Sequence, residues 1–390
     1  MRAISPDKDY IISIRRELHR YPEVGFDLPK TLSIIRRELD KLGIPYTERY
    51  GKSSIVATLA KGRGTKVIAL RADIDALPIK EDTGLEFASL HDGMMHACGH
   101  DTHCAMLLGA AKMLKACEGE LPCEVRLFFQ AAEEYAPGGA KLMCEDGCMD
   151  DVDAIIGAHI DPDIPLGTIA LNYGAMSASS HGFYLDFKGR SCHVSTPQKG
   201  VDAIAMACRA FMDIQVMRAR ELDPKAPVVL GIGEFHGGNA NNVVCDSVHL
   251  HGTIRATSNP VDEYVYRRIG EIAESVARDM GGSAEITTSK HYPSIINDPK
   301  LAKNVVSIGK RLLGEEAVDD NKECMMGGED FAFYTLRKPG VFFHIGMRSN
   351  KYEFAPWHNP KFIVDEDALT VGPEMFFAFA MEYGKDNENA

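Results

Sequence analysis

The stretch "TKVIALRADID", residues 65–75, decides the fold. Its first half is an almost continuous apolar run, which is typical of a strand covered on both faces, as in parallel sheets. Its second half places Asp73 and Asp75 directly after that strand. The segment therefore predicts a buried strand with polar side chains at its carboxyl end.

Strand and helix patterns alternate on both sides of this segment. Strand patterns cover residues 53–60, 123–130 and 152–160. Helical periodicity covers 9–21, 28–43 and the residues that follow "MHACGHD" up to Lys115. Such alternation predicts an α/β fold, with a mainly parallel mixed sheet flanked by helices.

The pattern changes near residue 178. Between residues 180 and 293 the expected order is β-α-β-β-α-β, which indicates a smaller, compact α+β domain. After it, helical patterns at 298–313 and 367–383 and the apolar strand 340–347 resemble the first part of the chain. We therefore expect one α/β domain, formed by residues 1–179 and 294–390, with the α+β domain 180–293 inserted into it.

The composition of the chain excludes some classes of function. With 45% hydrophobic and 25% charged residues, it is typical of a soluble globular protein. The formal net charge of −13 argues against a nucleic-acid partner. There is neither an apolar run long enough to cross a membrane nor a signal-peptide pattern at the N-terminus. We expect a cytoplasmic protein, and its 10 scattered cysteines agree with a reducing compartment.

Metal-capable side chains follow several predicted strands and also precede the helix after "MHACGHD". Because ligands bind at the carboxyl ends of strands in open α/β sheets, we expect these side chains to converge. The residues concerned are Asp73, Asp75, Cys98, His100, Glu133, Glu134, His159 and His358.

The residue types suit a catalytic divalent cation, which binds imidazole, carboxylate or thiolate and leaves one position open for water. Taken singly, each has an ordinary explanation: Cys98 could be a buried thiol, and Glu133 and Glu134 a solvated pair. Their common location at strand ends favours a metal site. Two adjacent glutamates could also divide the work, one binding metal and the other moving protons.

The motifs "MHACGHD", "FFQAAEE", "GAHI", "GGEDF" and "HNPKF", in this order, resemble those of the M20 metallopeptidase family. The resemblance is strongest to its amidohydrolase branch, which includes N-acyl-amino-acid, hippurate and indoleacetyl-amino-acid hydrolases. It extends over nearly the whole chain, from "RRELHRYPEVGF" to the last helix. It implies a catalytic domain that binds two divalent metal ions (Zn, Mn, Co or Ni), and an inserted lid domain through which a homodimer forms.

The resemblance also implies individual roles. A metal-activated water would cleave an N-acyl amino acid at its amide bond, with Glu133 as the general base and Asp75 behind the metals. His193 of the lid would reach across the dimer to the substrate's carbonyl oxygen, while Asn242 and Arg255 would hold its free carboxylate. The implied metal ligands, with Cys98 as the bridge, are Cys98, His100, Glu134, His159 and His358.

Two departures from the family pattern bear on the substrate. Ala131 stands where the family often has proline, and the sequence around His193 is Ser-Cys-His-Val rather than Gly-Gly-His-Ala. Four alternatives stay open: a dipeptidase or aminopeptidase of the same family, an N-acetyl-diaminopimelate-type deacetylase, a non-catalytic metal protein, and a cysteine hydrolase built on Cys98. The wide separation of the ligands along the chain argues against a structural zinc site, whose ligands are usually close in sequence.

Overall fold

The alternating patterns of the chain form an eight-stranded mixed sheet in the order β1-β2-β4-β3-β5-β12-β6-β11. Strand β3 lies between β4 and β5 and is parallel to both, and β12 is parallel to β5, so the predicted mainly parallel sheet is confirmed. The strands are β1 Tyr46–Thr47, β2 Ile55–Leu59, β3 Val67–Asp73, β4 Glu124–Gln130, β5 Ala154–Pro165, β6 Ile169–Ala170, β11 Val318–Asp319 and β12 Gly340–Arg348.

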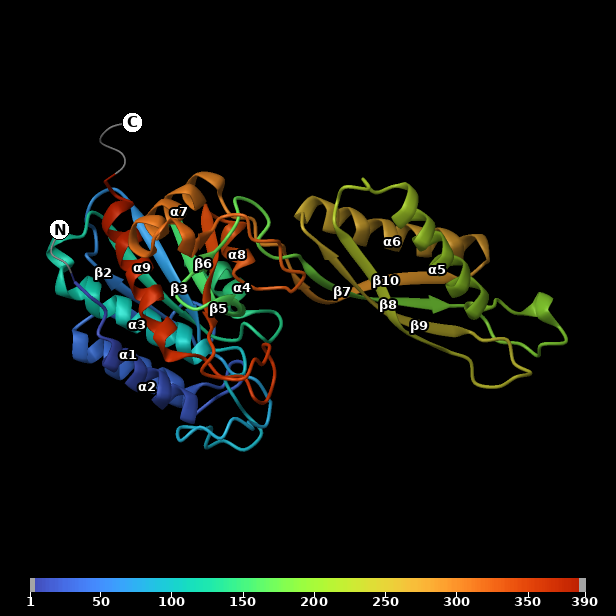
Figure 1. Cartoon of the computed structure of the whole chain (residues 1–390). Coiled ribbons are helices and arrows are strands. Elements are labelled where there is room, and N and C mark those ends of the chain that lie inside the picture. The colour runs from blue at the N-terminus through green and yellow to red at the C-terminus, as the bar shows by residue number, and fades with distance from the viewer. Residues whose placement is uncertain (1–3, 386–390) are drawn as a thin grey trace. The chain divides into compact units, whose positions relative to one another are not determined.

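The computed structural model describes residues 4–385; residues 1–3 and 386–390 of the expected α/β domain lie outside this range. It comprises two compact units (Figure 1). The first consists of the chain up to Met176, Ile296–Glu323 and the residues from Asp330 onward. The second consists of Ser177–Ile295 and the short segment Cys324–Glu329, which the sequence had assigned to the first domain.

Helix α3, His100–Ala116, is the central helix of the first unit. It lies against β3, while α1, α2 and α9 pack around it, and nearly all of its residues are buried. This explains why its sequence is apolar on every side rather than on one face. The remaining α-helices are α1 Lys8–Arg20, α2 Pro29–Leu42, α4 Gly139–Glu145, α7 Pro299–Leu313, α8 Ala332–Thr335 and α9 Val371–Glu382.

The second unit has the predicted β-α-β-β-α-β order. Its antiparallel sheet runs β10-β7-β9-β8. Residues alternate along β7, so that Phe183, Leu185 and Phe187 enter a core shared with α5 and α6. The elements are β7 Ser180–Lys188, α5 Ala203–Arg220, β8 Val228–Gly237, β9 Ser247–Ala256, α6 Asn259–Asp279 and β10 Ser283–Tyr292.

Some details differ from the sequence-based expectations. Strand β5 does not end beside His159 but continues to Pro165. The helix expected at 367–383 begins as a 3-10 turn, Glu366–Thr370, before α9. Among residues 4–385, no helix combines the length and apolarity that crossing a membrane requires.

Candidate metal centre

The turn Cys98-Gly99-His100 brings two potential ligands to the start of α3. Gly99 has φ 81°, a left-handed conformation that favours glycine. A Cβ atom at this position would lie 2.3 Å from Cδ1 of Ile160, so the turn also lacks space for a side chain. The sharp turn explains how a thiol and an imidazole two residues apart reach one place.

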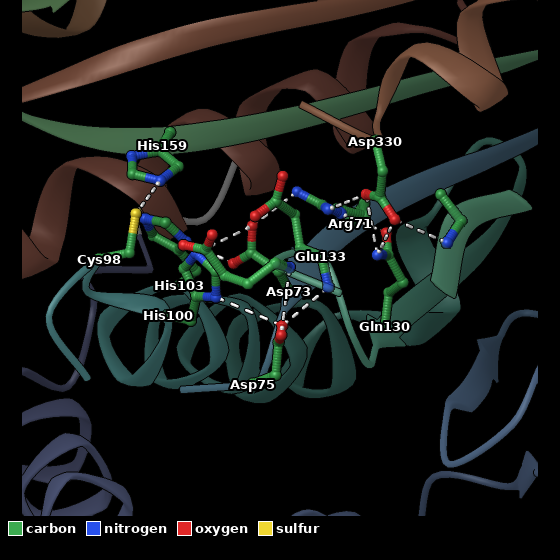
Figure 2. Close-up of polar contacts among 12 residues, drawn as sticks. Arg71, Asp73, Asp75, Cys98, His100, His103, Gln130, Glu133, His159 and Asp330 are labelled. Carbon is green, nitrogen blue, oxygen red and sulfur yellow. Dashed lines mark hydrogen bonds and ion pairs between the residues drawn. The ribbon is translucent and has the colours of Figure 1, made fainter. Parts of the chain in front are cut away.

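His159, on β5, lies directly beside this turn. Its Nδ1 is 2.7 Å from the carbonyl oxygen of Ile160, so Nδ1 carries the proton and donates it. The lone pair is therefore on Nε2, which lies 3.4 Å from Sγ of Cys98. Figure 2 shows the two side chains pointing toward each other. A histidine that binds metal through one ring nitrogen is usually oriented by a hydrogen bond that the other ring N–H donates.

The Glu133–Glu134 loop follows β4 and is held by Asp75. The backbone N–H groups of Glu133 and Glu134 donate to the two oxygens of the Asp75 carboxylate, at 2.9 and 3.2 Å. The same carboxylate lies 3.5 Å from Nδ1 of His100. Asp75 thus contacts both the loop with the glutamates and one of the candidate ligands.

His358 reaches the site from a loop after β12. Its backbone has φ 62°, and its N–H donates to the carbonyl oxygen of Ala97 at 2.9 Å. Its Nε2 lies 3.0 Å from Oε1 of Glu134. The backbone hydrogen bond to Ala97 joins this loop to the segment directly before Cys98.

The five expected ligands therefore converge within the first unit. Their donor atoms form two groups that share Cys98, and within each group the atoms lie within 4.8 Å of one another. One group is Cys98, His100 and His159; the other is Cys98, Glu134 and His358. Both ring nitrogens of His100 are buried with no hydrogen-bond partner among the described residues. Soft thiolate, imidazole and carboxylate donors, some otherwise unpartnered, fit a pair of divalent cations.

The charges around Cys98 and His100 also favour a cation-binding site over a reactive cysteine nucleophile. Burial, together with the Glu134 and Glu133 carboxylates, raises the pKa of the Cys98 thiol well above its usual range. Burial disfavours protonation of His100, but Asp73 and Asp75 outweigh it and raise its pKa to about 10. A cysteine nucleophile needs surroundings that lower its pKa. The anionic surroundings found here argue against a cysteine hydrolase.

Sequence reasoning missed a layer of residues behind the ligands. His103, one turn after His100, lies with Nδ1 2.5 Å from Asp73 and accepts the N–H of Ile160 at Nε2. Arg15 of α1 and Asp101 form a fully buried ion pair at 2.9 Å. The signal was present, because "GHDTH" repeats polar residues at helical spacing on an otherwise apolar helix.

The three expected lid residues lie in the second unit, at two separate places. His193 is exposed, and its Nδ1 lies 2.8 Å from Oγ of Ser195. Next to it, the N–H of Val194 donates to the carbonyl oxygen of Asn242 at 3.0 Å. Arg255 lies near the opposite end of β9. With a rise of about 3.3 Å per residue, a distance on the order of 25 Å along the strand separates Arg255 from the other two.

The fold and this donor set are those of a metal-dependent hydrolase. The chain belongs to the peptidase family M20/M25/M40, whose model it matches over residues 69–382. This confirms the resemblance that the sequence motifs carry.

Its relatives include both deacetylases and peptidases. It is 36% identical to the N-acetylcysteine deacetylase of Bacillus subtilis strain 168, over 95% of this chain and 96% of that protein. It is also 36% identical to thermostable carboxypeptidase 1 of Saccharolobus solfataricus, over 94% and 93%. Among solved structures, the Bacillus subtilis YXEP protein, described as a dinuclear metal binding peptidase of the M20 family, superposes with a TM-score of 0.81. That match has 34% identity and covers 96% of this chain and 97% of the other.

Proposed function

We propose that this chain hydrolyses the amide bond of N-acyl amino acids, releasing the acyl group from the amino acid. The observation that carries the proposal is the pair of donor groups that share Cys98, with Glu133 in the same loop as Glu134. The N-acetylcysteine deacetylase named above supports it, since that relative is named for deacetylation of an acylated amino acid.

The five converging residues would hold two divalent cations, with Cys98 as the shared ligand. His100 and His159 would complete one position, and Glu134 and His358 the other. When bound, such cations lower the pKa of a water molecule and polarise the amide carbonyl. Zinc fits the thiolate and imidazole donors, and manganese, cobalt and nickel are further candidates.

Glu133 would move the protons of the reaction. Its side chain is buried, and its backbone N–H is fixed by Asp75. The carboxylate would accept a proton from the attacking water and then transfer it to the nitrogen of the leaving amino acid. A positioned base of this kind contributes about 10²–10⁴-fold to a reaction rate.

Residues of the second unit would recognise the substrate. The guanidinium of Arg255 would bind the free carboxylate of the substrate through a charge-assisted hydrogen bond. His193 and Asn242 lie close to each other near the start of β9, whereas Arg255 lies near its other end. We therefore propose that Arg255 acts in its own chain, whereas His193 and Asn242 act on substrate bound to the other chain of a homodimer.

The test is a substrate panel run with zinc, manganese, cobalt and nickel. N-acetyl, N-benzoyl and N-indoleacetyl amino acids are compared with free dipeptides and with acyl amides that lack a carboxylate. The proposal expects the acylated amino acids to be cleaved with the highest kcat/KM. The similarity to a carboxypeptidase favours peptidase activity as the second candidate. Faster cleavage of dipeptides than of every acylated amino acid would establish that alternative and overturn the first.

A further inference from the structure

A second cluster of metal-capable side chains lies in the second unit. His181, on β7, and His291, on β10, are directly opposite each other in the antiparallel register. Asp262, in the first turn of α6, lies beside both. His181 and Asp262 are buried, whereas the side chain of His291 is 35% exposed. Three separate elements thus supply two imidazoles and one carboxylate to a place that bulk solvent can reach.

The distances within the cluster suit a single cation. Oδ2 of Asp262 is 2.8 Å from Nδ1 of His181 and 3.2 Å from Nε2 of His291. The two imidazole rings stack with their centroids 4.1 Å apart. Around a tetrahedral zinc ion with bonds of 2.0–2.1 Å, neighbouring donor atoms are about 3.3 Å apart. The two contacts of Asp262 are close to that spacing, and the shorter of them must lengthen by about 0.5 Å.

Two of the three donors also have the outer partners that metal ligands usually have. The hydroxyl of Ser179 donates to Oδ1 of Asp262 at 2.7 Å, which leaves Oδ2 for the cation. Nε2 of His181 lies 3.4 Å from Oγ1 of Thr288, so it can donate there while Nδ1 binds. Such contacts orient ligating carboxylates and histidines. Although burial opposes ionisation, hydrogen bonds from His181, His291 and Ser179 lower the pKa of Asp262 below its usual range.

We propose that His181, Asp262 and His291 bind a divalent transition-metal ion, with zinc as the probe of choice, at a site separate from the candidate catalytic centre. The ion would join β7, β10 and the start of α6. These strands adjoin the two ends of Ser177–Ile295, the segment that makes up most of the second unit. The site would therefore stabilise the unit at the place where its chain enters and leaves.

The variant that tests this site is His291→Gln, because His291 is the most exposed of the three ligands. The full-length protein and the variant are equilibrated with zinc at a low micromolar concentration, and bound metal is measured by mass spectrometry. The variant should bind one zinc fewer per chain, and zinc should raise its melting temperature less. Its hydrolase activity should be unchanged, which separates this proposal from that of the catalytic centre.

His249→Gln is the matched control. His249, on β9 of the same sheet, pairs with Asp186 at 2.8 Å. It should leave zinc content unchanged. Equal zinc content in the parent protein and His291→Gln would overturn the proposal and leave a hydrogen-bonded His-Asp-His network.

A second measurement needs no variant. Anomalous scattering at the zinc edge should give a peak among the three side chains, and the absence of a peak there would also overturn the proposal.

Discussion

Nε2 of His159 faces Sγ of Cys98 at 3.4 Å, although the two residues are 61 positions apart in the chain. The orientation follows from the opposite side of the ring, where Nδ1 donates to the carbonyl of Ile160. The imidazole thus presents a lone pair to a thiol that Gly99 has turned toward it. This relationship links β5 to the start of α3.

Glu133→Gln should abolish most turnover without loss of metal. The amide cannot accept a proton, so kcat should fall by about 10²–10⁴-fold. Metal content, measured on the same samples, should equal that of the parent protein. Glu134→Gln is the matched control, because it changes the neighbouring carboxylate that we assign to metal binding, and it should lower metal content as well. Near-normal turnover in Glu133→Gln would remove Glu133 from its role.

His358→Ala should lower metal content. His358 and Glu134 would share one cation with Cys98, so the variant should bind about one cation fewer per chain at limiting metal. His236→Ala, which changes an exposed histidine on β8, is the control and should retain the full content. Unchanged metal binding in His358→Ala would exclude His358 as a ligand.

Asp75→Asn should weaken the site indirectly. The carboxylate accepts the N–H groups of Glu133 and Glu134 and lies near His100. The asparagine amide has only one oxygen that can accept, so one of the two hydrogen bonds from the N–H groups of Glu133 and Glu134 would be lost. Loss of an outer partner typically costs 10–100-fold in metal affinity or activity. Titration with metal should therefore show activity restored at higher concentration, and an unchanged titration curve would contradict this role.

Asp101→Asn should destabilise the first unit. The variant removes the buried carboxylate that contacts both Arg15 and His19, while Arg15 keeps its ion pair with Glu366 at 3.2 Å, so the change should cost on the order of 3 kcal/mol. Glu48→Gln breaks the ion pair with Arg36, which is exposed at the surface, and should cost less than about 1 kcal/mol. Both are measured by denaturant unfolding of protein treated with a chelator, so that metal binding does not contribute. Equal effects of the two changes would contradict the prediction.

Two inactive variants should complement each other if His193 acts across a dimer. Glu133→Gln and His193→Ala are mixed in equal amounts under conditions that allow subunits to exchange. Half of the dimers would then be mixed, and each would have one intact site, so about a quarter of the parent activity should return. If His193 serves its own chain, neither chain of a mixed dimer has an intact site. No recovery, with exchange demonstrated separately, would therefore contradict the arrangement.

Much of the fold could be predicted because its signals are local. The apolar run before Asp73 identifies a buried strand, and the period-2 alternation of 180–189 identifies a half-exposed one. The two-residue strands β1, β6 and β11 were missed, since so few residues have no measurable period and depend on neighbouring strands. Likewise, the end of β5 depends on pairing with β12 as far as Pro165 rather than on the polar residues after His159.

The candidate ligands could be predicted from the sequence, but the residues that contact and orient them could not. Cys98, Glu134 and His159 stand out because they interrupt or follow apolar segments. By contrast, the contact between His103 and Asp73 requires the packing of α3 on β3, and that of Arg15 with Asp101 requires the position of α1. The approach of His181, Asp262 and His291 depends in the same way on strand register and on the packing of α6. Sequence spacing has no information on such contacts.

The most direct test of the central claim is anomalous diffraction from crystals of the metal-loaded protein, with data collected on both sides of the metal's absorption edge. The account predicts two peaks in the first unit, about 3.5–4 Å apart, with Sγ of Cys98 between them. One position should be completed by His100 and His159, and the other by Glu134 and His358. An active enzyme with a single peak there, or with peaks that Cys98 does not contact, would contradict the account.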